Sequence, residues 1–293
     1  MILDASANKH LIKRKRKDAF FRVVCFLAAT IGVILLLTFL SKIVVDGMPK
    51  LSWKFIVGDM STRARSTGIW QAVVGSIYVM VLTAIISVPV GVAAAIYLEE
   101  FTRRKNRFTD LIQLNIANLS GVPSIVYGLL GRVLFVYFFG FKQSVIAGAL
   151  TMSLLILPTV IIITQEALRA VPKTYRDGSL ALGSTQWQAI RLQVLPNAAS
   201  GIMTGIILSI SRAIGETAPL IVVGAAGYVT SVPKGLGDTY TVLPIKIFDW
   251  ANEAKAEFHQ VAATAILVLM VALMAMNSVA IFLRARQQAK TKV

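Results

Sequence analysis

Residues 175–220 read YRDGSLALGSTQWQAIRLQVLPNAASGIMTGIILSISRAIGETAPL, and this stretch decides the fold because it joins a polar loop to a charged apolar segment without a break. Pro172, just before it, suits the first turn of a helix, and Gly183 suits the position after a helix. Thr185 and Gln188 have the spacing of a capping box, which begins a second helix. The pattern predicts two short helices hinged near Gly183, although an ordinary helix-turn-helix connection between two spans has the same caps.

The segment 197–223 is apolar and exceeds the roughly 20 residues that a helix needs to cross a bilayer, yet Arg212 and Glu216 lie near its middle. Each ionised group at that depth costs about 2.5 kcal/mol or more, so both side chains should face a bundle interior or a watery path. At a spacing of four residues they share one helix face and can form an ion pair. Two interpretations follow: a functional charge in a transport path, or a structural ion pair that fixes the geometry of the bundle.

Small residues recur every four positions along the same segment, at Gly201, Gly205, Ser209, Ala213 and Thr217. Such a stripe allows the backbone of another helix to approach closely. We therefore expect this helix to pack tightly along one strip and to present its charges beside that strip.

The composition is that of a polytopic membrane protein. Hydrophobic residues make up 56% of the 293 residues, charged residues only 15%, and the mean hydropathy is +0.71. The formal net charge of +16 comes from Lys and Arg at the ends of apolar spans, which indicates membrane topology and anionic lipids rather than nucleic acid. The single cysteine, Cys25, excludes an internal disulfide framework and a cysteine zinc cluster.

Six apolar runs predict an all-α membrane protein with six transmembrane helices, at about 20–45, 69–98, 111–139, 143–164, 197–223 and 258–283. The first run is too long for the apolar core of a signal peptide. Basic residues fill the tails 1–19 and 284–293 and the connections 103–107 and 166–196. With the N and C termini cytoplasmic, every loop satisfies the positive-inside rule, whereas one span more or fewer would place a basic cluster outside.

The third run is irregular, since Asn, Ser, Gly and Pro interrupt its first half and Arg132 interrupts its second. Backbone of this kind is tolerated at membrane depth where it is buried in protein or lines a cavity, so Ser120 and Ser124 mark a candidate wall of a path. The alternative is an interfacial segment followed by a shorter span from about Ile125. Arg132 either faces the path or snorkels outward beside Lys142.

The two long connections 46–68 and 224–257 should lie on the outer side of the membrane. The second contains turn residues such as Gly227 and an apolar stretch, 242–250. We expect that stretch to lie in the membrane interface.

No catalytic centre emerges from the sequence. The chain has no G-x-x-x-x-G-K-[ST] loop, and KGLGDT at 234–239 lacks its spacing, so we expect no ATP site of the P-loop type. His10 and His259 stand alone, which argues against a histidine metal site, and no serine has a nearby histidine partner. We therefore expect a non-enzymatic chain with no metal or cofactor of its own, whose energy source lies elsewhere.

Four stretches resemble one family of transporters. RDGSLALGSTQWQAIRLQVLP (176–196) is similar to the cytoplasmic EAA loop of ABC importer permeases, and SRAIGETAPL (211–220) resembles the charged membrane helix of the phosphate-specific, PstA-type permeases. Two further stretches resemble the same permeases, namely TGIWQAVVGSIYVMVLTAIISVPVGVAAAIYLEEF (67–101) and LPIKIFDWANEAKAEFHQVAATAILVLM (243–270). The EAA loop departs from its usual pattern, because its Glu-Ala-Ala positions hold Asp177, Gly178 and Ser179 and its usual Ile is Gln193.

The resemblance implies the type I ABC importer permease fold and a permease subunit that moves inorganic phosphate across the cytoplasmic (inner) membrane of a prokaryote. Its partners would be a paralogous PstC-type permease, a dimer of P-loop ATPases that bind ATP and magnesium, and an extracytoplasmic phosphate-binding protein. The residues implied in ATPase coupling are Tyr175, Arg176, Asp177, Gly178, Ser179, Leu182, Gly183, Leu195 and Pro196. The expected substrate path comprises Arg212, Glu216, Thr217, Ser120 and Ser124.

In this interpretation the first short helix of the 172–196 loop docks in a groove on the ATPase and moves as a lever. The Gly183 hinge and Leu195-Pro196 would pass the movement to the fifth span. Arg212 would bind a phosphate oxygen, while Glu216 would orient Arg212 and prevent trapping of the anion. The residues alone leave open a permease for sulfate or molybdate, a self-sufficient secondary anion transporter and a membrane-anchored scaffold.

Overall fold

The computed structural model describes residues 5–102, 107–225, 229 and 231–291, and every regular element among them is helical. The expectation of an all-α protein is confirmed. Several basic and turn positions used in the topology prediction, namely 103–105, Gly227 and Lys292, lie outside the described residues.

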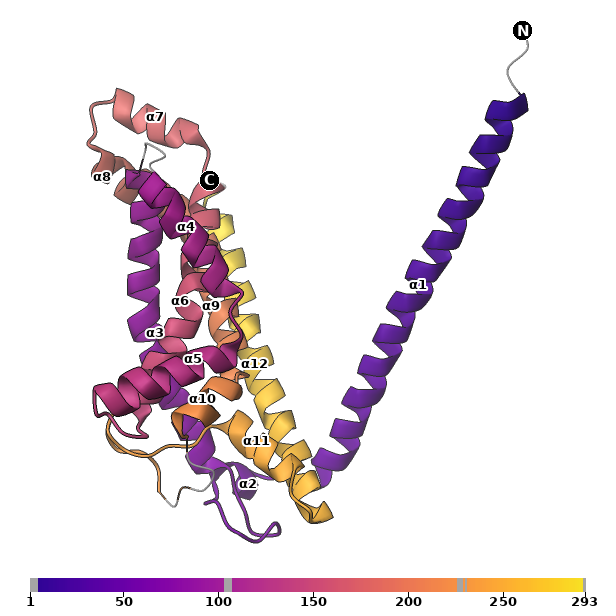
Figure 1. Ribbon diagram of the computed structural model, residues 1–293, viewed down its shortest axis with the longest axis vertical. Helices are drawn as coiled ribbons and strands as arrows, with labels where there is room; N and C mark the ends of the chain where they lie inside the picture. Colours follow the sequence, from indigo (N-terminus) through magenta and orange to yellow (C-terminus); the bar gives the residue numbers. More distant parts are fainter. Residues whose placement is uncertain (1–4, 103–106, 226–228, 230, 292–293) are drawn as a thin grey trace.

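Six passes run between the two ends of the molecule: α1 (Ala5–Gly47), α3 with the π-helical turn η2 (Trp70–Ile96 and Tyr97–Phe101), α4 with α5 and η3 (Arg107–Ser120, Ser124–Gly131 and Arg132–Phe138), α6 (Val145–Arg169), α9 (Leu195–Ile214) and α12 (Ala256–Thr291). Five of these passes contain a helix long and apolar enough to cross a membrane, and the bent α4–α5 pair is the sixth. Figure 1 shows the start of α1, the end of α12 and the loop carrying α7 (Lys173–Ala181) and α8 (Gln186–Ala189) at one end of the molecule.

The third pass differs from the single irregular span that the sequence predicted. The break falls within the expected polar stretch, but α4 and α5 meet at an angle of 103°. α4 starts near the α7–α8 end and α5 crosses the lower part of the bundle (Figure 1), so the pair still carries the chain toward the opposite end. Pro123 accounts for the corner, because a proline cannot donate a backbone hydrogen bond to a continuing helix.

The central helix is α6, which packs against both α3 and α9. A Cβ added to Gly91 of α3 would lie 2.7 Å from Val160 Cγ1, so the two helices touch closely. On the other side, a Cβ on Gly201 of α9 would lie 3.1 Å from Ala167 Cβ, and one on Gly205 would overlap Ile163 Cγ2. The predicted small-residue stripe is therefore confirmed as a helix-packing surface over this part of α9.

This close approach gives a first prediction. Gly205→Ala should lower the stability of the bundle by about 1–3 kcal/mol, because the new methyl group overpacks against Ile163. The loss should be smaller in the double variant with Ile163→Ala than the sum of the two single losses. Thermal unfolding in detergent measures both. The matched control is Gly178→Ala on α7, where nothing lies within 4 Å of an added Cβ; equal destabilisation by the two glycine substitutions would contradict the packing argument.

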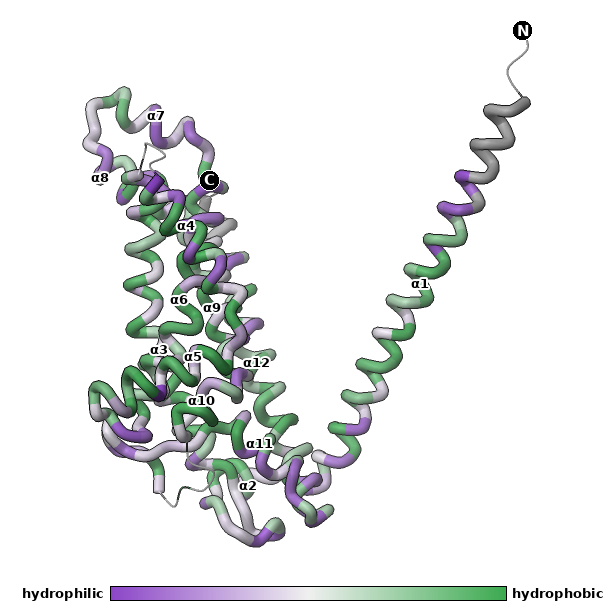
Figure 2. Tube along the Cα trace, viewed as in Figure 1, coloured by the Kyte–Doolittle hydropathy of each residue, from purple (hydrophilic) through white to green (hydrophobic). Residues whose placement is uncertain are grey.

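α1 stands apart from the other helices, and its middle is the most continuous apolar segment of the chain (Figures 1 and 2). Its attachment is near its end, where Thr264 Oγ1 of α12 donates a hydrogen bond to Gly47 O at 2.9 Å. Along the rest of the helix the large apolar side chains are bare, with Phe26 70% and Leu35 64% exposed. α1 therefore requires apolar surroundings that this chain does not supply.

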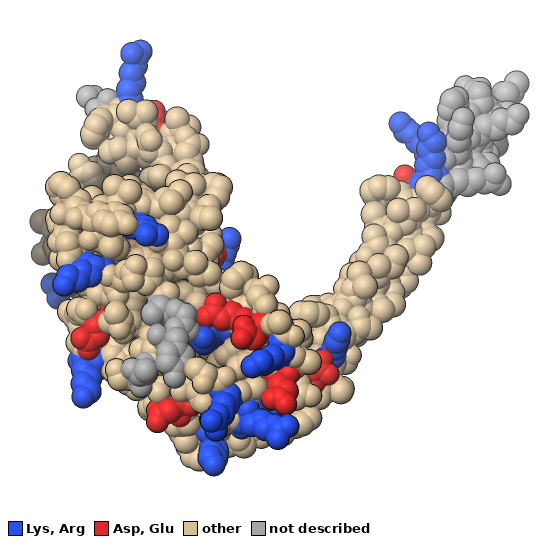
Figure 3. All heavy atoms as spheres, turned by 60° about the horizontal axis from the view of Figure 1, so that its bottom comes forward, with Lys and Arg blue, Asp and Glu red and all other residues tan. Residues whose placement is uncertain are grey.

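The end opposite α7 carries α2 (Trp53–Val57) and α11 (Leu243–Ala251), with basic and acidic side chains interspersed over its surface (Figure 3). The stretch 242–250, which the sequence places in the membrane interface, forms most of α11, and its position relative to a membrane stays a prediction. Ile245 and Trp250 are buried as α11 packs against α12 and α3. Helical spacing of apolar residues looks the same for an interfacial helix and for one that packs on its own bundle.

Candidate functional site

A cavity of about 280 Å³ opens where the α4–α5 turn meets α6 and the end of α9. Its lining comprises Ser120, Gly121, Val122, Pro123 and Ser124 of the turn, Leu155, Ile156 and Thr159 of α6, and Ser209, Arg212, Ala213 and Glu216 of α9 and the loop after it. The structure thus brings together Ser120, Ser124, Arg212 and Glu216 from the predicted path. Thr217 is not among the lining residues.

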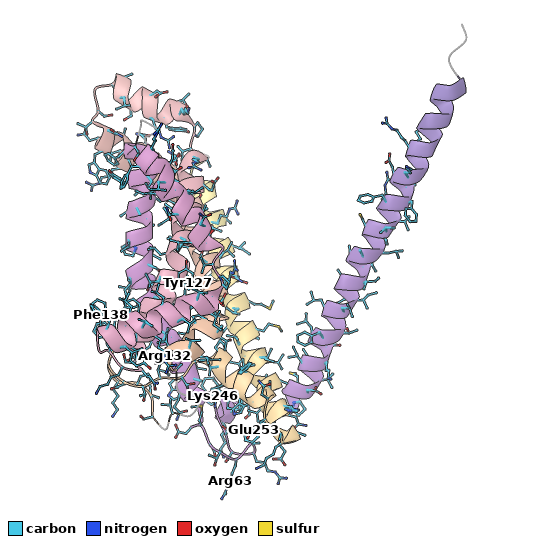
Figure 4. All side chains as sticks on the ribbon, in the orientation of Figure 1. Arg63, Tyr127, Arg132, Phe138, Lys246 and Glu253 are labelled. Carbon is cyan, nitrogen blue, oxygen red and sulfur yellow. The ribbon has the colours of Figure 1, made fainter. Side chains whose placement is uncertain are left out.

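The turn between α4 and α5 holds the two serines. Gly121 N donates to Asn118 O at 3.0 Å, which closes the end of α4. The buried hydroxyl of Tyr127 on α5 donates to Leu119 O at 2.8 Å, so α5 is tied back onto the carbonyl end of α4 (Figure 4). Ser120 precedes the turn and Ser124 begins α5, where the dipole of the helix favours negative charge.

α9 ends at Ile214, and residues 215–217 separate it from α10 (Ala218–Val223). Pro219 explains the break, because its ring has no N–H and would clash with the Gly215 carbonyl in a continuous helix. The predicted single helix over 197–223 is therefore wrong. Because the helix ends before Glu216, Arg212 and Glu216 do not share a helix face, and no ion pair joins them in the described part of the chain.

Arg212 is exposed in the cavity, and its guanidinium makes no hydrogen bond or ion pair with any described residue. The half-buried Glu216 lines the same cavity, and its carboxylate has no hydrogen bond or ion pair within the part of the chain that the structure describes. An unpaired cation deep in a membrane bundle is costly unless water or an anion meets it. The cavity therefore offers one cation, one carboxylate and several hydroxyl groups to a small polar solute, and a guanidinium fits an oxyanion in particular.

Two polar lining residues were not predicted as parts of the path. Thr159 follows Pro158 in the middle of α6, where the proline leaves a backbone carbonyl free, and this neighbouring proline is the signal that could have found it. Ser209 was predicted only as a member of the small-residue stripe. Its hydroxyl donates to Gly205 O at 2.8 Å, so it presents an oxygen to the cavity as an acceptor.

Arg132 lies outside the cavity lining. Its Nη1 donates to Val222 O at 3.3 Å, and its Nε and Nη2 donate to the Tyr137 hydroxyl at 3.2 Å (Figure 4). Val222 belongs to the last turn of α10, whose carbonyls have no partner within the helix. Arg132 therefore stabilises the end of α10 and holds it against η3, which neither of the two predictions for this residue anticipated.

The loop at the other end of the molecule consists of two short helices, as predicted. α7 ends at Ala181, and Gly183 adopts a positive φ of 84° after it. The capping box is present, with Thr185 N donating to Gln188 Oε1 at 2.8 Å and the Thr185 hydroxyl accepting from Gln188 N. α8 then continues through the π-helical turn η4 (Ile190–Val194) into α9, so Leu195 and Pro196 lie within a helical run rather than at a hinge.

Most of the residues implied in ATPase coupling are exposed on α7 and its end. Tyr175, Asp177, Gly178 and Leu182 are exposed, Leu182 to 91%, whereas Arg176 is turned inward. Ser179 lies within hydrogen-bond distance of Ser184, 2.6 Å between the two hydroxyl oxygens, and this contact closes the turn around Gly183. The apolar side chain of Leu182 therefore lies bare at the end of α7.

A second cavity, of about 780 Å³, lies between α7, α8 and the end of α6, with charged residues from η2, α6 and α7 in its wall. Arg176 bonds there to Glu100, and these hydrogen bonds raise the pKa of Arg176 above its ordinary value because they favour the charged guanidinium. Arg169 pairs nearby with Glu99 at 2.9 Å. Within the described residues, no cluster of three or more His, Cys, Asp or Glu could hold a metal ion.

The family model described as the binding-protein-dependent transport system inner membrane component matches residues 87–293. That range includes the whole cavity lining, from Ser120 to Glu216, and the α7–α8 loop.

Two relatives cover most of the chain. The phosphate transport system permease protein PstA of Mycobacterium leprae is 33% identical over 268 residues, which are 89% of this chain and 87% of that protein. The probable ABC transporter permease protein YqgI of Bacillus subtilis is 34% identical over 210 residues, which are 72% of this chain and 71% of that protein.

Solved structures agree on the fold. A chain of a bacterial alginate ABC transporter, crystallised with a periplasmic protein bound to an alginate pentasaccharide, superposes with a TM-score of 0.66 at 11% identity, over 92% of this chain and 94% of that chain. A chain of the inward-facing MetNI methionine ABC transporter superposes with a TM-score of 0.55 at 18% identity, over 76% of this chain and 94% of that chain.

Proposed function

Since the chain belongs to the family of binding-protein-dependent transport system inner membrane components, we propose that it is the permease subunit of an ATP-driven importer of inorganic phosphate. Permease relatives with phosphate in their names extend over almost nine tenths of the chain. The likeness to ABC transporters of alginate and methionine supports the fold, and the substrate rests on the permease relatives and on the cavity.

The observation that carries the proposal is the guanidinium of Arg212 in the 280 Å³ cavity, which has no partner among the described residues. Phosphate is a small, tetrahedral anion whose oxygens accept paired N–H donors from an arginine. Ser124 and Thr159 add hydroxyl donors from α5 and α6. Glu216, within the break between α9 and α10, supplies a negative charge that favours release of the anion once the cavity opens to the cytoplasm.

The path of energy transfer follows the helices. ATP-driven movement of an ATPase against the exposed face of α7 would be passed across Gly183 to α8. α8, η4 and α9 form a continuous helical run from Gln186 to Ile214, and Arg212 sits in its last turn. A displacement at the loop therefore reaches the cavity along one element, with Leu195 and Pro196 inside it.

A second permease subunit would provide the surroundings that α1 lacks. Bare apolar side chains line α1 away from the bundle, and a paralogous PstC-type permease would cover part of them, with lipid covering the rest. The end of the molecule that carries α7 and α8, together with the start of α1 and the end of α12 (Figure 1), would be cytoplasmic, and the α2–α11 end would meet the phosphate-binding protein. This arrangement belongs in the inner membrane of a prokaryote.

The proposal predicts the outcome of a transport measurement. In proteoliposomes that contain this chain, its partner permease and the ATPase, radiolabelled phosphate delivered with the binding protein should accumulate only when ATP is supplied. An excess of sulfate or molybdate should not reduce the uptake, because the phosphate-loaded binding protein and the cavity both select the anion.

Three other outcomes would replace the proposal. Phosphate uptake by this chain alone, driven by an ion gradient, would make it a secondary transporter. Strong competition by sulfate or molybdate would make it a broader oxyanion permease. If the intact assembly hydrolysed ATP but moved no anion, the chain would instead be a membrane-anchored scaffold.

A further inference from the structure

α7 has no apolar anchor of its own, since none of its residues is buried. Its inward attachment comes from Arg176, whose guanidinium reaches the π-helical turn η2 at the end of α3. The exposed side of α7 therefore remains free for another protein, while the charged side chain of Arg176 holds the helix to η2 and to the end of α6.

All three nitrogens of the Arg176 guanidinium donate hydrogen bonds, to Glu100 and to two backbone carbonyls. Nε donates to Glu100 Oε2 at 3.0 Å and Nη2 donates to Oε1 at 2.5 Å, which makes a bidentate pair. Nη1 donates to Val171 O at 2.8 Å and Nη2 to Leu168 O at 2.9 Å, at the carbonyl end of α6. The side chains are only 7% exposed for Glu100 and 20% for Arg176, so solvent screens the pair little.

The same turn also holds α8. Gln186 Nε2 donates a hydrogen bond to the backbone carbonyl of Glu100, and the rings of Phe101 and Trp187 lie with their centroids 6.5 Å apart. Both short helices of the loop are thus attached to residues 100 and 101. A π-helical turn at this position, between a membrane helix and a loop, is the kind of irregularity that recurs at functional sites.

We propose that Glu100 is a positioning residue for ATPase coupling, which ties the α7–α8 loop to α3 so that a displacement of the loop moves α3 together with α9. This inference rests on the proposed function. The route continues from α3 to α6 through the close contact of Gly91 with Val160, and α6 forms one wall of the cavity through Thr159. The loop is therefore joined to two walls of the cavity through the chain, to α6 before α7 and to α9 after α8, and Glu100 adds α3, which packs against α6.

The test separates coupling from assembly. Glu100→Gln keeps the size of the side chain and one acceptor oxygen but removes the charge and the bidentate pair. In the assembled transporter, phosphate uptake should fall about tenfold while ATP hydrolysis changes by less than about twofold, so that less phosphate moves for each ATP. Arg176→Lys should give the same change, and the double variant should be no worse than the more severe single variant.

The matched control is Glu99→Gln in the same turn. Glu99 pairs with Arg169 on α6 and makes no hydrogen bond or ion pair with a described residue of α7, and Arg169 keeps a second partner, Glu166, at 3.1 Å. This variant should retain the wild-type ratio of phosphate to ATP. An unchanged ratio in Glu100→Gln, or a parallel loss of uptake and ATP hydrolysis, would overturn the proposal, since the contact would then be dispensable or would only support docking.

Hydrogen exchange of the assembled transporter in nanodiscs gives a reading that needs no substrate. Amides of α7 should exchange about tenfold faster in Glu100→Gln than in wild type or Glu99→Gln, because the helix loses its attachment. Unchanged exchange would overturn the structural premise. If the wild type moves another anion, the proposed substrate is wrong, whereas the exchange result and the ratio measured with that anion still decide the role of Glu100.

Discussion

Replacing Arg212 by Gln is expected to lower phosphate uptake by about 100-fold at unchanged abundance of the transporter in the membrane. A hydrogen bond to a charged group contributes about 1.5–3 kcal/mol, and a guanidinium offers two of them to one oxyanion. A loss of about 3 kcal/mol corresponds to a factor of about 100. Stability should change little, because Arg212 has no hydrogen bond or ion pair to lose within the described residues.

Two further variants sharpen the result. Arg212→Lys keeps the charge but not the planar fork, so uptake should be intermediate between wild type and Arg212→Gln. Arg286→Gln removes an exposed cation near the end of α12, far along the chain from the cavity, and should transport as wild type does. Labelled-phosphate uptake into cells, with each variant at matched abundance, measures all three. Full uptake by Arg212→Gln would remove Arg212 from the path and direct attention to Ser124 and Thr159.

Length and apolar composition were sufficient to predict the passes of the fold, because a membrane helix must satisfy its own backbone and exclude charge over about 20 residues. The capping box at Thr185 and the glycine after α7 could also be predicted, since both depend on neighbouring residues only. The break between α9 and α10 was missed although its local signal, Gly215 followed by Pro219, was present in the sequence. The hydropathy of the surrounding residues outweighed it.

The site could be predicted in composition but not in geometry. Charges and polar turns at membrane depth pointed to Ser120, Ser124, Arg212 and Glu216, and all four line one cavity. Whether Arg212 pairs with Glu216 depended on a helix break, and the partner of Arg132 depended on a contact 90 residues away in the chain. Long-range contacts of this kind leave no periodic signal in one sequence. Glu100 was overlooked for the same reason.

Leu182→Asp is expected to weaken retention of the ATPase by about 100-fold and to abolish uptake with it. The side chain is 91% exposed at the end of α7, so it contributes almost nothing to the fold of this chain. In a protein contact, burying a leucine contributes about 1.5–3 kcal/mol, and burying an unpaired carboxylate in its place costs more. Together these effects account for a loss of about 3 kcal/mol, or a factor of about 100.

The comparison that isolates this contact uses the same substitution at the other end of the molecule. Leu236 is 50% exposed in the loop before α11, and only its backbone carbonyl holds Ile146 N, so Leu236→Asp should leave the ATPase bound. Leu182→Met, which preserves an apolar surface, should also retain it. Co-purification of the ATPase with each variant, followed by titration of the purified partners, measures the affinity. Equal retention by Leu182→Asp and wild type would mean that α7 does not meet the ATPase through this face. The contact would then have to be made by α8, whose exposed Trp187 is the next apolar side chain along the loop.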